Sequence, residues 1–306
     1  MSELDIGQFG KGALHIRDDR DFIPAKGWEA PFDWSKAVDK SEFETVEDQG
    51  SSLSCTGQAT AGIIGNLQFG IRLSARYVYS QTFLPTGGAY VRDSLTIGAR
   101  QDPSRESDFS SYPNTEDHLR DKGGIVIKNR PVDWVYVAIP LSIEAIARAI
   151  RDHSFVSLAF YGSNDGWSQS DIIYKDSVWA HNVIGCRPVV RNNKKTIKIK
   201  NSWSEVWGNE GYGYVDEDYL NKAGICAYAY EKKFIKPIPY QLKNKNITKA
   251  LWFVKANKSF INALYQERHN RDATLAEQRH FTGYTVKNAS NIILGAWRSP
   301  FYGKTN

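Results

Sequence analysis

Cysteine and methionine are scarce in this sequence, and long hydrophobic runs are absent. The 306 residues include 3 cysteines and 1 methionine. Cys55, Cys186 and Cys226 form no CxxC pair, and so sparse and odd a count argues against a disulfide framework and against a zinc site. No window approaches the roughly 18 consecutive apolar residues of a membrane-spanning helix. The histidines lack metal-ligand spacing and no GxxxxGKS/T loop occurs, so we predict that no metal and no cofactor is needed.

Charge of neither sign dominates the whole chain, but the charges are unevenly distributed. There are 39 Lys and Arg against 34 Asp and Glu. Residues 236–306 hold 12 basic and 3 acidic side chains, whereas residues 1–235 are net acidic. This change of sign, together with the prolines of Lys236-Pro237-Ile238-Pro239, indicates a domain boundary. We therefore predict an N-terminal leader over 1–29, a folded domain over 30–235 and a basic C-terminal extension over 236–306.

The C-terminal extension resembles no family. Apolar spacing predicts a helix over 249–265 and a buried strand over 291–297. Its basic residues are scattered among apolar ones, which argues against nucleic-acid binding. The charge motivates the hypothesis that this segment docks a partner or a substrate. Deletion of residues 240–306 tests it, and unchanged activity on the physiological substrate would contradict it.

The first residues, Met1-Ser2-Glu3-Leu4-Asp5, lack the basic and apolar regions of a secretory signal peptide. Together with the sparse cysteines, they predict a cytoplasmic, reducing location. Delivery to another cell by a non-classical route is left open.

A run of small residues leads up to Cys55. The stretch reads Gln49-Gly50-Ser51-Ser52-Leu53-Ser54-Cys55-Thr56, and apolar residues follow it at helical spacing. Cys55 is therefore expected at a helix N-terminus, where free N–H groups and the macrodipole stabilise a thiolate. A nucleophilic cysteine needs that environment, although a lone cysteine is more often a small buried hydrophobe.

Two polar residues continue the inward faces of predicted strands. The alternation over 178–184 places His181 on an inward face, and the alternation over 196–201 does the same for Asn201. A buried amide needs a hydrogen-bond partner, and an imidazole N–H is one. A cysteine nucleophile needs a base that a third group orients. The order Cys55, His181, Asn201 therefore indicates a catalytic triad.

These segments resemble the papain-like cysteine peptidases, over roughly residues 28–235. The most specific match lies in residues 197–215, where Asn-Ser-Trp is followed by Trp-Gly and Gly-Tyr-Gly. Segments after residue 88 (Ala-Tyr-Val-Arg-Asp and Ser-Tyr-Pro) resemble bacterial-type members. The resemblance implies an α+β, two-lobe fold, with a helical lobe, an antiparallel β-barrel-like lobe and a cleft between them. The C-terminal extension would be a small appendage.

The resemblance also implies a role for each candidate residue. Cys55 would attack a peptide or related acyl carbonyl as a thiolate, His181 would hold the ion pair and later protonate the leaving group, and Asn201 would orient the imidazole. The Gln49 amide and the Cys55 backbone N–H would form the oxyanion hole. Trp203 would shield the Asn201–His181 hydrogen bond from water, or serve as core packing alone.

The remaining candidates are Gly87 and Gly88, which lie where the family places a glycine pair that hydrogen-bonds an extended substrate backbone. An ordinary turn is the alternative. The sequence departs from the secreted members in two ways. Ser52 stands where they carry a disulfide cysteine, and too few residues precede the domain for their long helical propeptide. We therefore predict reduced thiols, and control by substrate choice, a partner or the extension.

The leading functional prediction is a cysteine peptidase that cleaves amide bonds in protein or peptide substrates. The same thioester would also permit acyl transfer to an amine, giving a transpeptidase or peptide ligase, because water and amine compete for it. A non-catalytic binding module of the same fold is the third hypothesis. The presence of Cys55, His181, Asn201 and Gln49 together argues against it.

Overall fold

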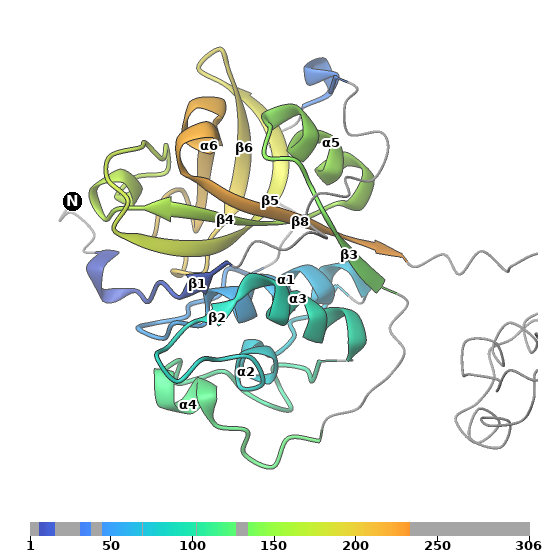
Figure 1. The fold of residues 1–306 in the computed structure, drawn as a ribbon, viewed down its shortest axis with the longest axis vertical. Coiled ribbons are helices and arrows are strands. Elements are labelled where there is room, and N and C mark those ends of the chain that lie inside the picture. The colour runs from blue at the N-terminus through green and yellow to red at the C-terminus, as the bar shows by residue number, and fades with distance from the viewer. Residues whose placement is uncertain are drawn as a thin grey trace, which may run out of the picture. The chain divides into compact units, whose positions relative to one another are not determined.

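A six-stranded antiparallel sheet is the central element of the structure (Figure 1). The computed structural model describes residues 6–15, 31–37, 45–68, 70–101, 103–126 and 134–232. The strand order is β3-β8-β4-β5-β6-β7. The strands are β3 (Trp134–Ala138), β4 (Val156–Gly162), β5 (Trp179–Arg191), β6 (Lys194–Lys200), β7 (Tyr212–Asp216) and β8 (Gly224–Lys232).

A tight hairpin joins β5 to β6 and brings two candidate residues together. Asn192 and Asn193 connect the strands with φ of 50° and 58°. Two consecutive left-handed residues are what a two-residue hairpin of matching twist requires, and asparagine tolerates them well. Ile184 pairs with Lys200 across the hairpin. His181 and Asn201 therefore lie at the same end of these strands.

Alternate side chains of the sheet contribute to two separate hydrophobic cores. In β4, Leu158 and Phe160 belong to one core, whereas Ala159 belongs to the other. This follows from the two-residue period of a strand, which points successive side chains to opposite faces. Both faces are therefore buried, and both need helices to cover them.

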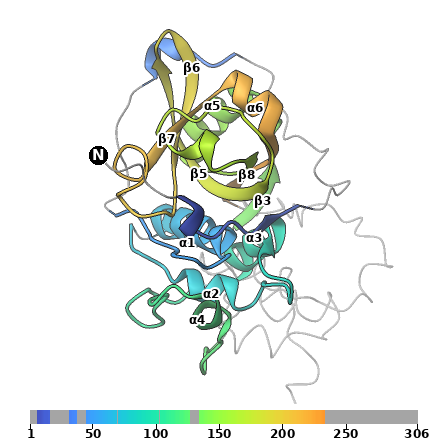
Figure 2. The same ribbon diagram turned by 90° about the vertical axis from the view of Figure 1, so that its left-hand side faces the viewer.

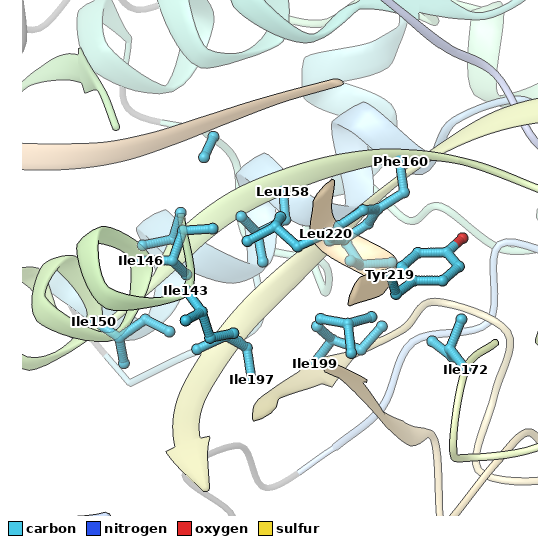
Figure 3. Close-up of a cluster of buried hydrophobic side chains, with 14 of the residues drawn as sticks. Ile143, Ile146, Ile150, Leu158, Phe160, Ile172, Ile197, Ile199, Tyr219 and Leu220 are labelled. Atoms are coloured by element: carbon cyan, nitrogen blue, oxygen red, sulfur yellow. The ribbon is translucent and has the colours of Figure 1, made fainter. Parts of the chain in front are cut away.

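Helices cover both faces of the sheet (Figure 2). The helices α5 (Ile143–His153) and α6 (Glu217–Ala223) pack on the first face, and Figure 3 shows isoleucines of α5 directed at the strands. Ser142 begins α5 by accepting a hydrogen bond from the Ala145 N–H, which satisfies one free helix donor. The second face is covered by α1 (Cys55–Gln68) and α3 (Val91–Arg100).

Small residues allow α1 to be buried between its neighbours. A Cβ atom on Gly57 would lie 3.0 Å from the Ala75 carbonyl oxygen, and one on Gly62 would lie 2.8 Å from Cδ1 of Ile184. Each helical glycine costs about 1 kcal/mol relative to alanine, so these positions are occupied by glycine for close packing. As a result, α1 is held between α2 and β5, and its first residue, Cys55, is fixed in place.

The remaining elements are short. The helices α2 (Ala75–Tyr79) and α4 (Glu116–Arg120) are capped by the side chains of Ser74 and Thr115. Near the N-terminus, β1 (Ala13–Leu14) pairs in parallel with β2 (Ala89–Tyr90). In Figures 1 and 2, β1 lies between the sheet and the group of helices that includes α1 and α2. Three 3₁₀ turns complete the described structure: η1 (Ile6–Gln8), η3 (Trp34–Lys36) and η4 (Asp165–Trp167).

The predicted α+β class is confirmed, as are the helix that follows Cys55 and the two strands near His181 and Asn201. Cys55, Cys186 and Cys226 are buried, and no disulfide joins them. Within the described ranges, no helix is long and apolar enough to cross a bilayer. The predicted helix over 249–265, the strand over 291–297 and their proposed docking role lie outside the described residues, and the three predicted domain ranges remain predictions.

Candidate active site

His181 and Asn201 are hydrogen-bonded in the structure. The His181 Nε2 lies 2.7 Å from the Asn201 Oδ1, which also accepts a 2.8 Å hydrogen bond from the Ser202 backbone N–H. Since Oδ1 is an acceptor, Nε2 carries the proton and Nδ1 is left as a proton acceptor. The Nδ1 atom is buried and has no hydrogen-bond partner among the residues that the structure describes. The arrangement therefore provides an oriented base.

Indole rings surround the imidazole. Trp203 stacks on His181 with ring centroids 4.5 Å apart, while Trp167 and Trp179 present edge-on contacts at 5.7 and 6.2 Å. Burial among these rings lowers the pKa of His181 to about 3, an effect that the Asn201 hydrogen bond partly offsets. The imidazole is therefore neutral at neutral pH, and Trp203 both packs in the core and covers the histidine.

Cys55 is the first residue of α1, as the sequence predicts, but its sulfur is fully buried. The backbone N–H groups of Gly12 and Asn182 lie near the sulfur and favour its thiolate form. Burial raises the pKa of Cys55 to about 11, and these N–H groups counter it only in part. In this state burial outweighs the stabilisation expected from the helix N-terminus, so the group is a thiol at neutral pH.

The Gln49 side chain points its amide N–H groups at two carbonyl oxygens. Nε2 donates to the Gly10 oxygen at 2.8 Å and to the Ser52 oxygen at 2.7 Å. The Ser202 Oγ donates to Gln49 Oε1 at 2.6 Å. This bond fixes which end of the amide faces Gly10. Sequence reasoning missed Ser202, whose only signal is its place directly after Asn201.

Residues 9–14, which we call the occluding segment, lie against the candidate residues. Phe9 stacks on Trp203 with centroids 5.6 Å apart. The Lys11 Nζ lies 5.3 Å from the Trp203 ring and 5.7 Å from the Trp179 ring. The Gly12 backbone N–H lies near the Cys55 sulfur. The segment therefore lies against both Cys55 and the indole rings around His181. These residues belong to the predicted N-terminal leader, for which the sequence predicts no role.

Two glycines make this close approach feasible. A Cβ atom on Gly10 would lie 1.8 Å from the Ser52 carbonyl oxygen, and one on Gly12 would lie 2.2 Å from the Leu53 carbonyl oxygen. Both neighbours are backbone atoms of the loop before Cys55, which cannot rotate away as a side chain can. Only glycine fits at these two positions. The spacing Gly-x-Gly was the available sequence signal.

The structure places Gly87 and Gly88 in a turn beside the occluding segment. Their φ values are 93° and 73°, which favour glycine. The Gly88 N–H donates to the Tyr79 hydroxyl at 3.0 Å, so it is directed into the protein. The next residue, Ala89, donates its N–H to the Gly12 oxygen at 3.0 Å. The backbone that pairs with an extended segment here is therefore Ala89, which the sequence analysis did not single out, and substrate binding by Gly87 and Gly88 stays a prediction.

Within the described ranges, no group of three His, Cys, Asp or Glu side chains could hold a metal ion. A buried base, a cysteine at a helix N-terminus and an amide donor aimed at a carbonyl together define a site suited to nucleophilic attack on an acyl group.

Solved structures share this fold. Xylellain, a cysteine protease from Xylella fastidiosa, superposes with a TM-score of 0.61 at 18% identity, covering 74% of this chain and 97% of that chain. The digestive procathepsin L2 proteinase from the larval midgut of Tenebrio molitor superposes with a TM-score of 0.57 at 20% identity, covering 74% of this chain and 79% of that chain. The fold is thus the papain-like α+β fold.

Sequence comparisons agree with the fold. Residues 104–232, which contain His181 and Asn201, match the model of the papain family cysteine protease. A cysteine protease of Blomia tropicalis is 26% identical over 214 residues, or 63% of this chain. The chain spans 62% of the length of that relative. These comparisons show that residues 104–232 are similar to the papain family cysteine proteases and that the fold is that of papain-like structures.

Proposed function

We propose that this protein is a cysteine peptidase that cleaves amide bonds in protein or peptide substrates, with Cys55 as nucleophile, His181 as base and Asn201 as the residue that orients the base. The observation that carries the proposal is the 2.8 Å hydrogen bond from the Gln49 amide to a peptide carbonyl, that of Gly10. It supports the view that this amide can bind the oxygen of a scissile peptide group.

In the proposed reaction, the Cys55 proton passes to His181 Nδ1, which gives a thiolate and an imidazolium. The sulfur attacks the carbonyl carbon, and the electron pair of the C=O bond moves onto oxygen. Gln49 Nε2 and the Cys55 backbone N–H stabilise this oxyanion. His181 then donates its proton to the departing amine nitrogen as the C–N bond breaks, which leaves a thioester. Water deprotonated by His181 attacks the thioester and returns the thiol.

Asn201 would contribute by holding the imidazole in the tautomer that accepts at Nδ1. Its Oδ1 is itself held by the Ser202 N–H. The stacked Trp203 would exclude water from this hydrogen bond, which strengthens it in the low-dielectric interior. The imidazolium would thereby keep a hydrogen-bond acceptor on Nε2.

Labelling of the full chain by an epoxysuccinyl thiol inactivator tests the proposal, read as intact mass and as peptide maps. We expect one adduct, on Cys55, and none on Cys55→Ala. In parallel, a quenched fluorescent protein substrate should be cleaved by the wild type and not by Cys55→Ala. Cleavage that persists in Cys55→Ala would overturn the assignment. A labelled Cys55 without any turnover of acyl substrates would instead favour the binding-module alternative.

Transfer of the acyl group to an amine is the second candidate, because a thioester accepts either nucleophile. Products formed in ¹⁸O water with a primary amine present separate the two reactions. Peptide acids carrying ¹⁸O indicate hydrolysis, whereas amides of the added amine indicate a transpeptidase or ligase.

A further inference from the structure

One carboxylate, that of Glu116, joins the two backbone segments on either side of the occluding segment. Glu116 begins α4 and lies far in sequence from both. Its Oε2 accepts a 2.7 Å hydrogen bond from the Leu53 backbone N–H. Its Oε1 accepts a 2.7 Å hydrogen bond from the Tyr79 hydroxyl. We call Glu116, Tyr79 and the two backbone groups that they hold the Glu116 network.

The first arm of the network holds the loop that carries the proposed nucleophile. Leu53 lies two residues before Cys55, and its carbonyl oxygen is one of the atoms against which Gly12 packs. The loop 49–54 lacks a regular helix or strand. A hydrogen bond that a backbone N–H donates to a carboxylate is about twice as strong as one between neutral groups. Glu116 is therefore a strong tether for this loop.

The second arm holds the backbone that pairs with an extended chain. The Tyr79 hydroxyl accepts the Gly88 N–H at 3.0 Å while it donates to Glu116. Burial and the neighbouring Glu116 carboxylate raise the pKa of Tyr79, so the phenol keeps the proton that this chain of bonds needs. With Gly88 held, the buried Ala89 N–H faces the occluding segment and donates to the Gly12 oxygen.

Packing and charge reinforce both arms. A Cβ atom on Gly87 would lie 2.3 Å from Cδ1 of Leu53, so the loop and the turn are in direct contact. The Arg120 Nε donates to Glu116 Oε1 at 2.7 Å and forms an ion pair with this carboxylate. The Arg120 guanidinium also lies 5.0 Å from the Phe83 ring, which belongs to the segment before the turn.

We propose that Glu116 is a positioning residue that sets the spacing between the nucleophile loop and the Ala89 backbone, and so determines how an extended peptide is aligned on Cys55. The inference rests on the proposed function for its kinetic part alone. An extended substrate that pairs with Ala89 needs both segments at a fixed separation, whereas a small acyl ester needs the nucleophile and the oxyanion donor only.

The kinetic test compares a long peptide with a small phenyl ester on the full chain. In Tyr79→Phe, which loses both hydroxyl bonds and keeps the ring, KM for the peptide should rise about 10-fold while kcat/KM for the ester stays near that of the wild type. Glu116→Gln should also impair turnover of the peptide more than turnover of the ester. It should in addition lower kcat, because the loop before Cys55 is released as well. An equal loss on both substrates, or no change on either, overturns the proposal.

The matched control is Glu106→Gln. Glu106 also accepts a backbone N–H and a hydroxyl, both from Ser111, and belongs to the same part of the chain. It has no hydrogen bond to Leu53, Tyr79 or Gly88 among the described contacts. We expect Glu106→Gln to leave the ratio of peptide to ester turnover unchanged. If Glu106→Gln changes the ratio of peptide to ester turnover as much as Tyr79→Phe does, the effect comes from general destabilisation. That result would contradict the positioning role.

Amide hydrogen exchange on the full chain tests the same spacing without turnover. In Glu116→Gln the peptides that cover 51–54 and 84–89 should exchange about 10-fold faster, while β4 keeps its protection. Unchanged exchange in both segments overturns the proposal even if the peptidase is active. Faster exchange in a protein that hydrolyses neither substrate would support the positioning role and count against the proposed function instead.

Discussion

The Gln49 amide and the Gly10 carbonyl form a 2.8 Å hydrogen bond, so the group proposed to bind a substrate oxygen already binds an oxygen of its own chain. Two residues further on, the backbone N–H of Gly12 lies near the Cys55 sulfur. Both polar groups that would face a substrate peptide are thus engaged by the occluding segment. In this arrangement the thiol and the imidazole are neutral, and the protein is expected to react slowly with thiol reagents.

Replacement of Gly12 should release Cys55. In Gly12→Ala the new methyl group would fall 2.2 Å from the Leu53 carbonyl oxygen, so the segment must move away. Overpacking of this kind costs about 1–3 kcal/mol, which corresponds to roughly 5- to 150-fold in the population of the open state. We expect alkylation of Cys55 by iodoacetamide to accelerate by such a factor, measured by peptide mapping.

Leu14→Ala is the control for that experiment. Leu14 also belongs to the occluding segment, but 37% of its surface is exposed. Its truncation should leave the alkylation rate of Cys55 close to that of the wild type. If Gly12→Ala and Leu14→Ala react alike, the glycine fit does not control access to the sulfur.

Loss of the Gln49 amide should slow the chemical step. The donor is expected to act on the developing oxyanion, so Gln49→Ala should reduce kcat by about 10²- to 10³-fold and change KM little. Ser202→Ala should have a smaller effect in the same direction, because Ser202 only orients the amide. Gln81→Ala, which removes an amide bonded to the Tyr77 carbonyl, serves as the control. A Gln49→Ala variant with the kcat of the wild type would remove this residue from the oxyanion hole.

Replacement of Asn201 should impair both activity and stability. Asn201→Ala removes the acceptor that holds His181 Nε2, and leaves a buried imidazole N–H without that partner. Such a loss costs about 1–3 kcal/mol. We expect kcat/KM to fall about 10- to 100-fold and the denaturation midpoint in urea to fall as well. Retention of the full wild-type pH–rate profile would contradict an orienting role.

Stability should fall at both ends of the pH range. The pKa of Cys55 rises from 9.0 to about 11 on folding, so between these values the unfolded chain loses a proton that the folded chain keeps, and stability falls as pH rises. The pKa of His181 drops from 6.5 to about 3, so stability falls as pH decreases through that interval. Urea denaturation across pH measures both. The alkaline slope should be shallower in Cys55→Ala, and an identical slope would show that Cys55 is not the group responsible.

A buried ion pair between Lys200 and Glu47 should be essential to the fold. Lys200 is 2% exposed and its Nζ donates to Glu47 Oε2. Removal of one partner of a buried pair destabilises by about 3–5 kcal/mol, so Glu47→Gln should lower the free energy of unfolding by that amount. The exposed pair of Lys222 and Asp218 is the matched control, since exposed pairs contribute about 0–1 kcal/mol. Equal effects of Glu47→Gln and Asp218→Asn would argue that Lys200 is solvated.

The sequence was sufficient to predict the elements whose signals are periodic. The spacing after Cys55 predicts α1, and the alternations near His181 and Asn201 predict β5 and β6. The amide at Asn201 stands out because an apolar residue is expected at that position. These signals are local, and the two-residue Asn192-Asn193 hairpin then brings His181 and Asn201 together.

The rest depends on contacts between distant segments and has no periodic signal. Gly10 and Gly12 matter because of carbonyl oxygens in another loop, which a one-dimensional pattern does not reveal. Glu116 appears in the sequence as an ordinary first-turn carboxylate of a short helix. The strand-pairing role of Ala89, next to the predicted Gly87 and Gly88, depends on which N–H the Tyr79 hydroxyl binds. Such assignments require coordinates.

The place of the occluding segment in the chain has a consequence for biosynthesis. A ribosome makes residues 9–14 before it makes Cys55, and long before it makes the β5–β6 hairpin that carries His181 and Asn201. Base and orienting residue can form their hairpin locally, whereas the sulfur joins them only when distant parts of the chain meet. Residues 9–14 are therefore already synthesised when Cys55, His181 and Asn201 come together. The segment that contacts Cys55 can thus dock as soon as the parts of the domain around it have folded.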